Sequence, residues 1–156
     1  MGEPKWNKRA KLTGKGGAAS FISVPHYVLN SDEFAALTGN ELRMLMELAR
    51  QYKGSNNGDL TAMREQLVAR GWKSHQTIDV QLAKLERKGW IVKTRQGGKR
   101  LCCTLYAVTI WPIDECGGKH QWPAEHKASH RWKNKTTGPI SIIHRPDYQA
   151  QKGIAA

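Results

Sequence analysis

The sequence predicts a mainly α-helical α+β domain with a small antiparallel β hairpin near its end. Two observations predict this class: four segments between residues 31 and 88 have helix caps or helical spacing, and the apolar spacing changes to two after Gly89. The charge locates the domain. The chain has 156 residues and a formal net charge of +12, but residues 21–116 hold 13 bases against 10 acids. This nearly balanced middle segment is the expected folded unit, and most of the excess charge lies outside it.

The first two helices are predicted by their caps, after a short extended entry over residues 21–29. Ser31 or Asn30 can cap a brief helix over residues 32–37. Thr38, followed three positions later by Glu41, is a capping box, so a second helix is expected to start there. The spacing of this helix predicts a buried face of Leu42, Leu45, Met46, Ala49 and Tyr52 and an exposed face of Arg43, Glu47 and Arg50.

The next two helices are separated by a short turn. Leu60 is expected in a short strand, and Thr61 is expected to cap a helix that Gly71 ends. Ser74 then caps a helix that runs from about His75 to Lys88. Two helices joined by a four-residue turn that contains glycine form a helix-turn-helix.

After Gly89, residues 90–94 and 101–110 predict two strands, with a Gly-Gly hairpin tip between them. Cys102 and Cys103 are expected on the second strand with their side chains on opposite faces, and a buried structural thiol is the expected role. This order of elements is that of a winged helix-turn-helix domain over residues 21–115. A flexible basic arm (1–20) and a basic, largely irregular tail (116–156) flank it.

The sequence resembles the winged-helix proteins that phages, prophages and integrated mobile elements encode, over roughly residues 21–113. The segments that carry the resemblance are Phe21-Ile22-Ser23-Val24-Pro25, Leu37-Thr38-Gly39, Gly54-Ser55-Asn56-Asn57-Gly58, Arg70-Gly71-Trp72 and the strand and turn from Gly89 to Gly98. The resemblance implies a DNA-binding role in regulating the element or in starting its replication. The tail after Cys116 lies outside it.

The second helix of the helix-turn-helix is expected to enter the major groove of DNA. Ile78, Leu82 and Leu85 share one face and must point to the core. The residues expected at the DNA are Lys73, Ser74, His75, Gln76, Thr77, Val80, Ala83, Lys84 and Arg87. Gln76 suits a bidentate contact to adenine and Val80 a thymine methyl, while the cations suit phosphate or guanine. The alternative is an ordinary solvated helix face.

Basic residues elsewhere are expected to add phosphate contacts. Arg95, Lys99 and Arg100 suit a wing that lies on the adjacent backbone or minor groove, or else a solubilising turn. The arms contribute Lys5, Lys8, Arg9, Lys11, Arg131, Lys133 and Lys135. If about four to six phosphates are neutralised, the affinity should fall with salt at a log–log slope of about −4 to −5.

The tail contains two further patterns. Cys116, His120, His126 and His130 offer four zinc ligands, but their spacing matches no standard finger, and phosphate-contacting histidines are the plainer interpretation. We therefore expect no cofactor. Trp122 and Trp132 lie among Lys127 and other basic residues. They are expected either to stack on unpaired nucleobases or to dock on the domain or a partner.

Other classes of protein are not favoured. The sequence shows no paired carboxylates at useful spacing, no phosphate-binding glycine loop and no Ser, His and Asp in the order of a catalytic triad. We therefore do not expect an enzyme. No apolar run is long enough to cross a bilayer, none follows Met1, and three cysteines make no disulfide framework. The expected location is therefore the cytoplasm.

We expect a sequence-specific protein that binds double-stranded DNA and regulates transcription, as a monomer or weak homodimer. The alternatives are a replication-initiation protein that binds an origin and recruits other proteins through its tail, and a winged-helix module that binds an acidic protein. Deleting residues 117–156 should spare DNA-site recognition in a regulator and abolish function in an initiator. The target sequence and the direction of regulation are not encoded in any pattern here.

Overall fold

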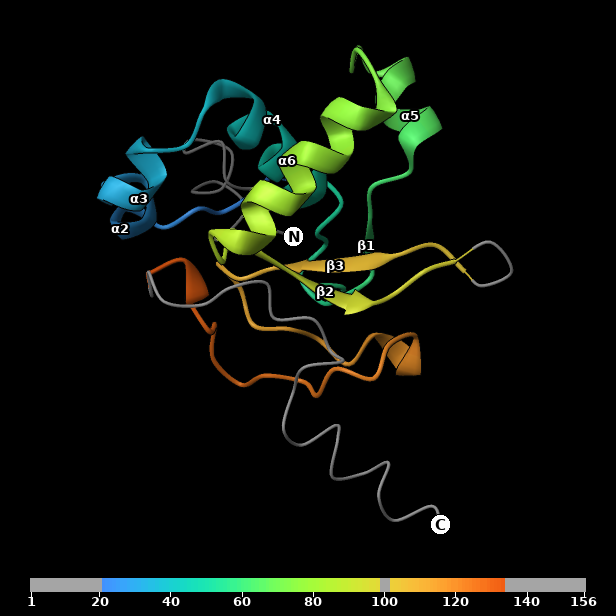
Figure 1. Ribbon diagram of the computed structural model, residues 1–156. Coiled ribbons are helices and arrows are strands. Elements are labelled where there is room, and N and C mark those ends of the chain that lie inside the picture. Colours follow the sequence, from blue (N-terminus) through green and yellow to red (C-terminus); the bar gives the residue numbers. More distant parts are fainter. Residues whose placement is uncertain (1–20, 99–101, 134–156) are drawn as a thin grey trace, which may run out of the picture.

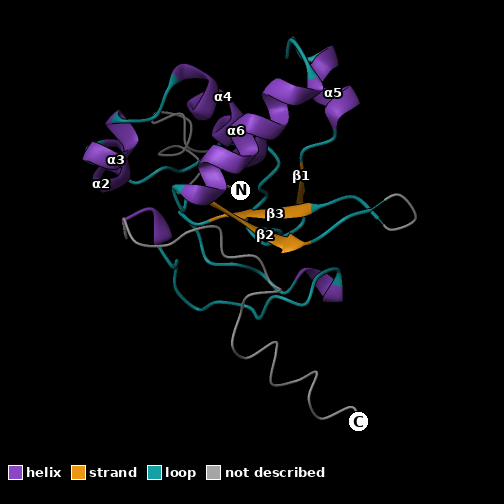
Figure 2. Ribbon diagram, viewed as in Figure 1, coloured by secondary structure: helices purple, strands orange, loops and turns teal. Residues whose placement is uncertain are grey.

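The computed structural model describes residues 21–98 and 102–133. Helices cover one face of a three-stranded antiparallel sheet, and residues 112–133 run across the other face (Figure 1). The elements are α2 (His26–Leu29), α3 (Asp32–Ala35), α4 (Gly39–Ala49), β1 (Leu60–Thr61), α5 (Arg64–Ala69), α6 (His75–Arg87), β2 (Ile91–Arg95) and β3 (Leu105–Val108), as Figure 2 shows. Two 3-10 turns follow, at Cys116–Gly118 and Arg131–Lys133. The expected mixed α+β class is confirmed.

The sheet has the strand order β1-β3-β2, so the last strand lies between the other two. Leu60 pairs with Tyr106, and Ile91 pairs with Val108. Ile91 packs toward the helices, whereas Val92 packs with Ala107, Ile113 and Trp122 on the opposite face. Because both faces are covered, all four residues of the central strand β3 are buried.

The predicted caps of the first helices are confirmed, but the predicted buried face of α4 is partly wrong. Ser31 caps α3, and Thr38 and Glu41 form the capping box of α4. The buried residues of α4 include Met44, Leu48 and Glu47 in addition to Leu45 and Ala49. Glu47 is buried because Arg50 and Arg70 both bond its Oε2 at 2.7 Å. A pattern of apolar residues cannot reveal a carboxylate that two cations compensate.

Two local predictions before α6 are wrong. Residues 26–29 form the short helix α2 instead of extended chain. Thr61 lies in β1, where its backbone N–H donates to Gln51 Oε1 (3.0 Å), so it does not cap a helix. Helix α5 starts after Met63 without a side-chain cap. Thr61 is held by the sheet because β1 pairs with β3, which is a contact distant in sequence.

The hairpin is shorter than predicted, and the expected buried role of its cysteines is wrong. Strand β3 starts at Leu105, so Cys102 and Cys103 lie before it, and both are exposed. The ladder is irregular between Lys93 and Arg95. Beyond it, the N–H of Gly97 donates to Thr104 Oγ1 (3.1 Å). This side-chain hydrogen bond replaces the regular backbone ladder. The side chains therefore stop alternating between the two sheet faces before the chain reaches the cysteines.

Residues 116–133 belong to the packed structure, although they are irregular. The Trp132 ring stacks on the Trp90 ring, with centroids 4.8 Å apart and planes 4° apart. Trp122 is buried in the cluster on the outer sheet face. Gly89 has φ +79°, and a Cβ placed there would lie 2.7 Å from the carbonyl oxygen of Arg131. Of the two roles expected for these tryptophans, docking on the domain is therefore confirmed, and stacking on unpaired bases is contradicted by their burial.

Candidate nucleic-acid interface

Helix α6 lies across the sheet with one face in the core and the other in solvent. Ile78, Leu82 and Leu85 are buried, as the spacing predicts, and α6 packs on α4 and β2. Ser74 caps its start by accepting a hydrogen bond from the Thr77 N–H (3.1 Å). The first turn contains no acidic residue. The first N–H groups of the helix and its dipole therefore form a favourable place for a phosphate.

The turn before α6 is fixed by Arg43, a residue that the sequence pattern marked only as exposed. Its guanidinium donates to the carbonyl oxygens of Arg70 (2.7 Å) and Gly71 (3.3 Å). The same group lies 4.8 Å from the centroid of the buried Trp72 ring. Gly71 has φ +89°, which favours glycine. Arg43 thus ties α4 to the end of α5 and sets where α6 begins.

Glu47 adds a second link between α4 and α5 through Arg70. Burial by itself would raise the pKa of Glu47, but the hydrogen bonds from Arg50 and Arg70 outweigh it, and the pKa is lowered. Glu41 at the start of α4 shows the same balance: burial opposes ionisation, and the bond from Lys88 lowers the pKa. Both carboxylates are therefore charged anchors that hold the helices beneath the interface.

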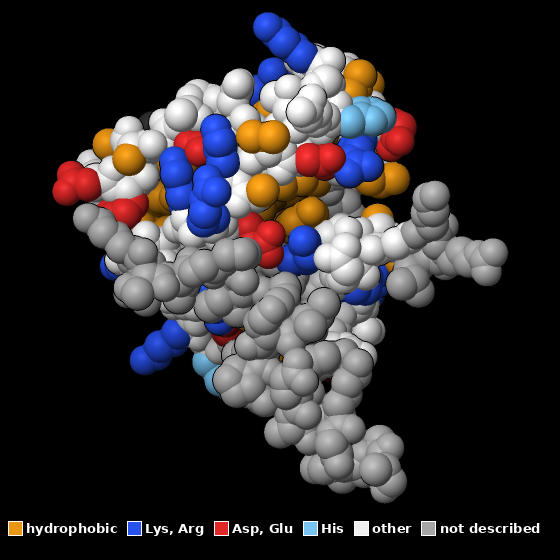
Figure 3. Space-filling model, in the orientation of Figure 1, with side chains coloured by type: hydrophobic (Ala, Val, Ile, Leu, Met, Phe, Trp, Pro, Cys, Tyr) orange, Lys and Arg blue, Asp and Glu red, His pale blue; other side chains and the backbone are white. Residues whose placement is uncertain are grey.

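The residues predicted to contact DNA lie together on the outer side of α6. Lys73, Ser74, His75, Gln76, Val80 and Arg87 are exposed, and Thr77 and Lys84 are half-buried. Val80 is 41% exposed, although it is an aliphatic side chain in the middle of a helix. Figure 3 shows Lys and Arg side chains gathered over the end of α6 that leads to β2. The structure thus places these residues on one continuous surface, which we call the α6 face.

The α6 face carries cations that have no carboxylate partner in the part of the chain that the structure describes. Six basic side chains pair with carboxylates: Arg50 and Arg70 with Glu47, Arg64 with Asp79, Lys88 with Glu41, Lys93 with Glu86, and Lys119 with Asp59. In contrast, Lys73, Lys84 and Arg87 make no ion pair within the described residues. Their charges are available to an external anion.

The predicted wing residues differ from this pattern. Arg95 donates from Nη1 to the Lys119 carbonyl (2.9 Å) and from Nη2 to the Cys103 carbonyl (3.1 Å). The arginine therefore holds the hairpin to the 116–119 segment, instead of standing free at the tip as the sequence suggested. Lys99 and Arg100 lie outside the described residues.

The predicted arm residues are only partly described. The Arg131 guanidinium lies 5.3 Å from the Trp122 ring centroid. The Lys133 ammonium lies 4.9 Å from the Tyr27 centroid and 5.2 Å from the Trp132 centroid. Lys5, Lys8, Arg9, Lys11 and Lys135 fall outside the described residues.

The four candidate zinc ligands do not converge. His120 is buried against Gly58, and its Nδ1 accepts the Trp122 N–H (3.2 Å). His130 lies beside Tyr27, with Nε2 3.2 Å from the phenol oxygen. Across the described parts of the chain, which include Cys116 and His126, no three His, Cys, Asp or Glu side chains are placed to hold a metal ion. Burial lowers the pKa of His120, which fits a packed, neutral imidazole.

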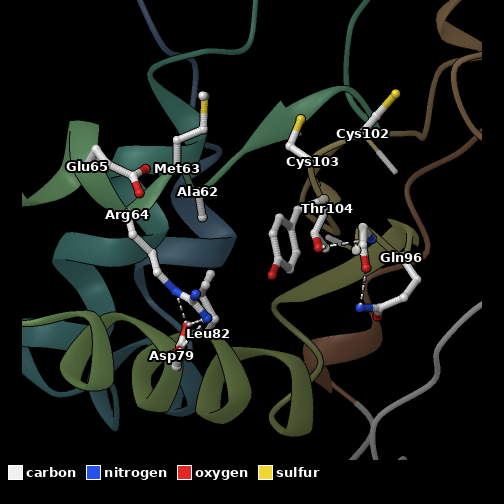
Figure 4. A pocket seen from close by; sticks show the side chains of 13 residues that line it. Ala62, Met63, Arg64, Glu65, Asp79, Leu82, Gln96, Cys102, Cys103 and Thr104 are labelled. Carbon is white, nitrogen blue, oxygen red and sulfur yellow. Dashed lines mark hydrogen bonds and ion pairs between the residues drawn. The ribbon is translucent and has the colours of Figure 1, made fainter. Parts of the chain in front are cut away.

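A cavity of about 600 Å³ lies beside the α6 face, between α5, α6 and the hairpin. Figure 4 shows Arg64 and Asp79 on its helix side and Cys102, Cys103 and Gln96 on its hairpin side. Arg64 Nη2 bonds both carboxylate oxygens of Asp79, at 3.0 and 2.8 Å. Burial, with help from Glu86 and Asp79, raises the pKa of Tyr106 in its wall to about 12. The sequence did not predict this cavity, because it depends on the chain leaving the strand before Leu105.

None of the described helices is long and apolar enough to cross a membrane. Comparisons of the chain with models of protein families, with curated proteins and with solved structures found no match.

Proposed function

We propose that this chain binds double-stranded DNA through the α6 face and reads its sequence there, as a winged helix-turn-helix protein does. The observation that carries the proposal is the group of cations on the exposed side of α6 that have no carboxylate partner among the described residues. The fold neutralises six of its cations internally, whereas Lys73, Lys84 and Arg87 stay without carboxylate partners on one helix surface. A phosphate-binding face needs such cations gathered on one surface, and here they flank the exposed Gln76 and Val80.

The composition of the α6 face supports base recognition in addition to charge attraction. Its middle presents Gln76 and Val80, with cations before and after them. An amide can make two hydrogen bonds to the major-groove edge of adenine, at N6 and N7, and a small aliphatic side chain can contact a thymine methyl. The N-terminus of α6 and the flanking cations would fix the register on the backbone.

The cellular role proposed with this activity is regulation of transcription in a phage or mobile element. It depends on the sequence resemblance, and replication initiation is the second role that the same resemblance supports. Both roles use the α6 face in the same way. A protein-binding module would not, so the experiments below test the DNA interface first.

Selection from random duplex DNA tests base recognition directly. The full chain is expected to enrich a motif, and Gln76→Ala is expected to relax one position of it and to cost about 1–3 kcal/mol on the preferred base. Gln76 is exposed, so the melting temperature should stay unchanged. Gln66→Ala is the matched control, because Gln66 is an exposed glutamine on α5. If the unchanged chain enriches no motif, the protein-binding alternative gains instead.

The salt dependence of binding tests the role of the unpaired cations. The full chain is expected to lose affinity with a log–log slope of about −4 to −5, and Lys84→Gln should reduce the size of that slope by about 1. Gln76→Ala should leave the slope unchanged, since it removes no charge. Lys53→Gln, on the loop after α4, is a control that should change neither slope nor affinity. A slope near zero for the full chain would contradict nucleic-acid binding.

A further inference from the structure

The cavity between α5, α6 and the hairpin is lined by a buried hydroxyl group. Tyr106 contributes it from the central strand β3, and this residue is only 8% exposed. Its phenol oxygen neither donates nor accepts a hydrogen bond within the described residues. Leaving a buried polar group unpaired is unfavourable. A molecule in the cavity that offers a polar atom to this hydroxyl would therefore be stabilised there.

The charges around the cavity favour a positive occupant over a negative one. Arg64 is neutralised by Asp79, since its Nη2 lies 3.0 and 2.8 Å from the two carboxylate oxygens. Glu65 also lines the cavity and has no ion-pair partner in the described part of the chain. Burial, and then the charges of Glu86 and Asp79, raises the pKa of the Tyr106 phenol to about 12. The carboxylates thus outweigh Arg64 at the hydroxyl, where they disfavour negative charge.

The rest of the helix-side wall is largely apolar. Ala62, Met63 and Leu82 line the cavity, and Figure 4 shows them on the same side as Glu65. At about 600 Å³, the cavity is within the size range of small-molecule sites. Such sites combine an apolar lining with a few polar groups that orient the bound molecule. This wall therefore suits a molecule with an apolar body and one positive group.

We propose that this cavity binds small organic amines with an apolar body, whose ammonium group donates a hydrogen bond to the Tyr106 hydroxyl. Glu65 supplies the unpaired negative charge, and Met63 and Leu82 pack against the apolar body. The neutral phenol can accept this bond, and its ring adds an aromatic face for the cation. No residue of the α6 face lines the cavity, so the site does not depend on the proposed DNA binding.

Binding of three indole compounds to the full chain tests the preference for a cation. Tryptamine carries an ammonium group, tryptophol has a neutral hydroxyl in its place, and indole-3-acetate is an anion. In calorimetric titrations, tryptamine is expected to bind about fivefold more tightly than tryptophol, the factor that one charge pair about 4 Å apart supplies in water. Indole-3-acetate should bind most weakly. Equal affinities for the three compounds, or no binding of tryptamine, would overturn the proposal.

Two variants test where the ammonium group lies. Tyr106→Phe removes only the hydroxyl, so tryptamine should bind about fivefold more weakly, while the melting temperature should not fall. Glu65→Gln should remove most of the preference for tryptamine and leave tryptophol binding unchanged. Glu115→Gln is the matched control at an exposed glutamate outside the cavity, and it should change neither affinity. Unchanged tryptamine binding in both cavity variants would place the molecule elsewhere and overturn the site.

The cysteines give a footprint of the bound molecule in the unchanged chain. Cys102 and Cys103 line the cavity, whereas Cys116 does not. Tryptamine is expected to slow the alkylation of Cys102 and Cys103 by iodoacetamide, a neutral reagent, to a degree that follows its binding curve. Cys116 should keep its rate, and peptide mass follows each site separately. Slowing at all three cysteines, or at none of them, would contradict binding in this cavity.

Discussion

Replacing Trp132 by alanine is expected to cost about 3–5 kcal/mol of unfolding free energy, which is the usual range for a buried tryptophan. Trp132 is 2% exposed and stacks on Trp90, which is 1% exposed. Trp90 in turn meets Phe34 edge-on at 6.0 Å. The substitution would leave a cavity where residues 131–133 contact the core, and it would uncover Trp90. Chemical denaturation of the full chain measures the effect.

Trp132→Phe is the matched control for this prediction. The Trp132 indole N–H has no hydrogen-bond partner among the described residues, so phenylalanine would forfeit packing but no polar contact. Its cost should be clearly smaller than that of alanine. A cost below about 1 kcal/mol for Trp132→Ala would show that the segment does not pack on Trp90 in solution.

The burial of Trp122 and Trp132 also decides where the chain can be cut in the deletion experiment that separates a regulator from an initiator. Deleting residues 117–156 would remove Trp122 and Trp132 with the tail, and thus part of the core. That deletion cannot separate a regulator from an initiator, because it would destabilise the domain in both. Ending the chain after Lys133 keeps both tryptophans and makes the intended comparison.

Asn57→Ala is expected to have an effect of similar size, about 3–5 kcal/mol, because it leaves several buried backbone groups without partners. Asn57 is fully buried. Its Nδ2 donates to the carbonyl oxygens of Val108, Trp111 and Pro112, at 2.9, 3.1 and 2.8 Å. Its Oδ1 accepts the Val108 N–H at 2.8 Å. One side chain therefore joins the loop before β1 to the end of β3.

The backbone of Asn57 strengthens this junction. Its N–H donates to Asp114 Oδ2 and its carbonyl oxygen accepts the Asp114 N–H, both at 2.8 Å. Asn56→Ala is the matched control, since Asn56 bonds only its own loop and the end of α4, at Lys53 N and Gln51 O. It should cost about 1 kcal/mol. Equal costs at the two positions would contradict the assigned role of Asn57.

Local sequence signals predicted the parts of this fold that depend on neighbours in the chain. Ser31, Thr38 and Ser74 cap the helices that they were expected to cap, because a cap needs only the next three residues. The phase of α6 was predicted because Ile78, Leu82 and Leu85 have helical spacing around one axis. The α6 face follows from that phase alone.

Predictions that depended on distant contacts were the ones that failed. Glu47 is buried by Arg70, Thr61 is held in a strand by Leu105, and Arg95 is turned inward by the carbonyls of Cys103 and Lys119. The cavity beside α6 exists because the hairpin leaves the ladder at Gly97. None of these partners lies within a helical turn or a tight loop of the residue that it binds.

The sequence by itself determined the α+β class, the helix caps, the outward face of α6 and the concentration of excess charge outside the central domain. Only the tertiary structure decided which cations are already neutralised, where the two tail tryptophans lie and which side chains line the cavity beside α6. The physical reason is that caps and periodicity are local properties of the chain. Ion pairs, burial and cavities arise only when segments far apart in sequence meet.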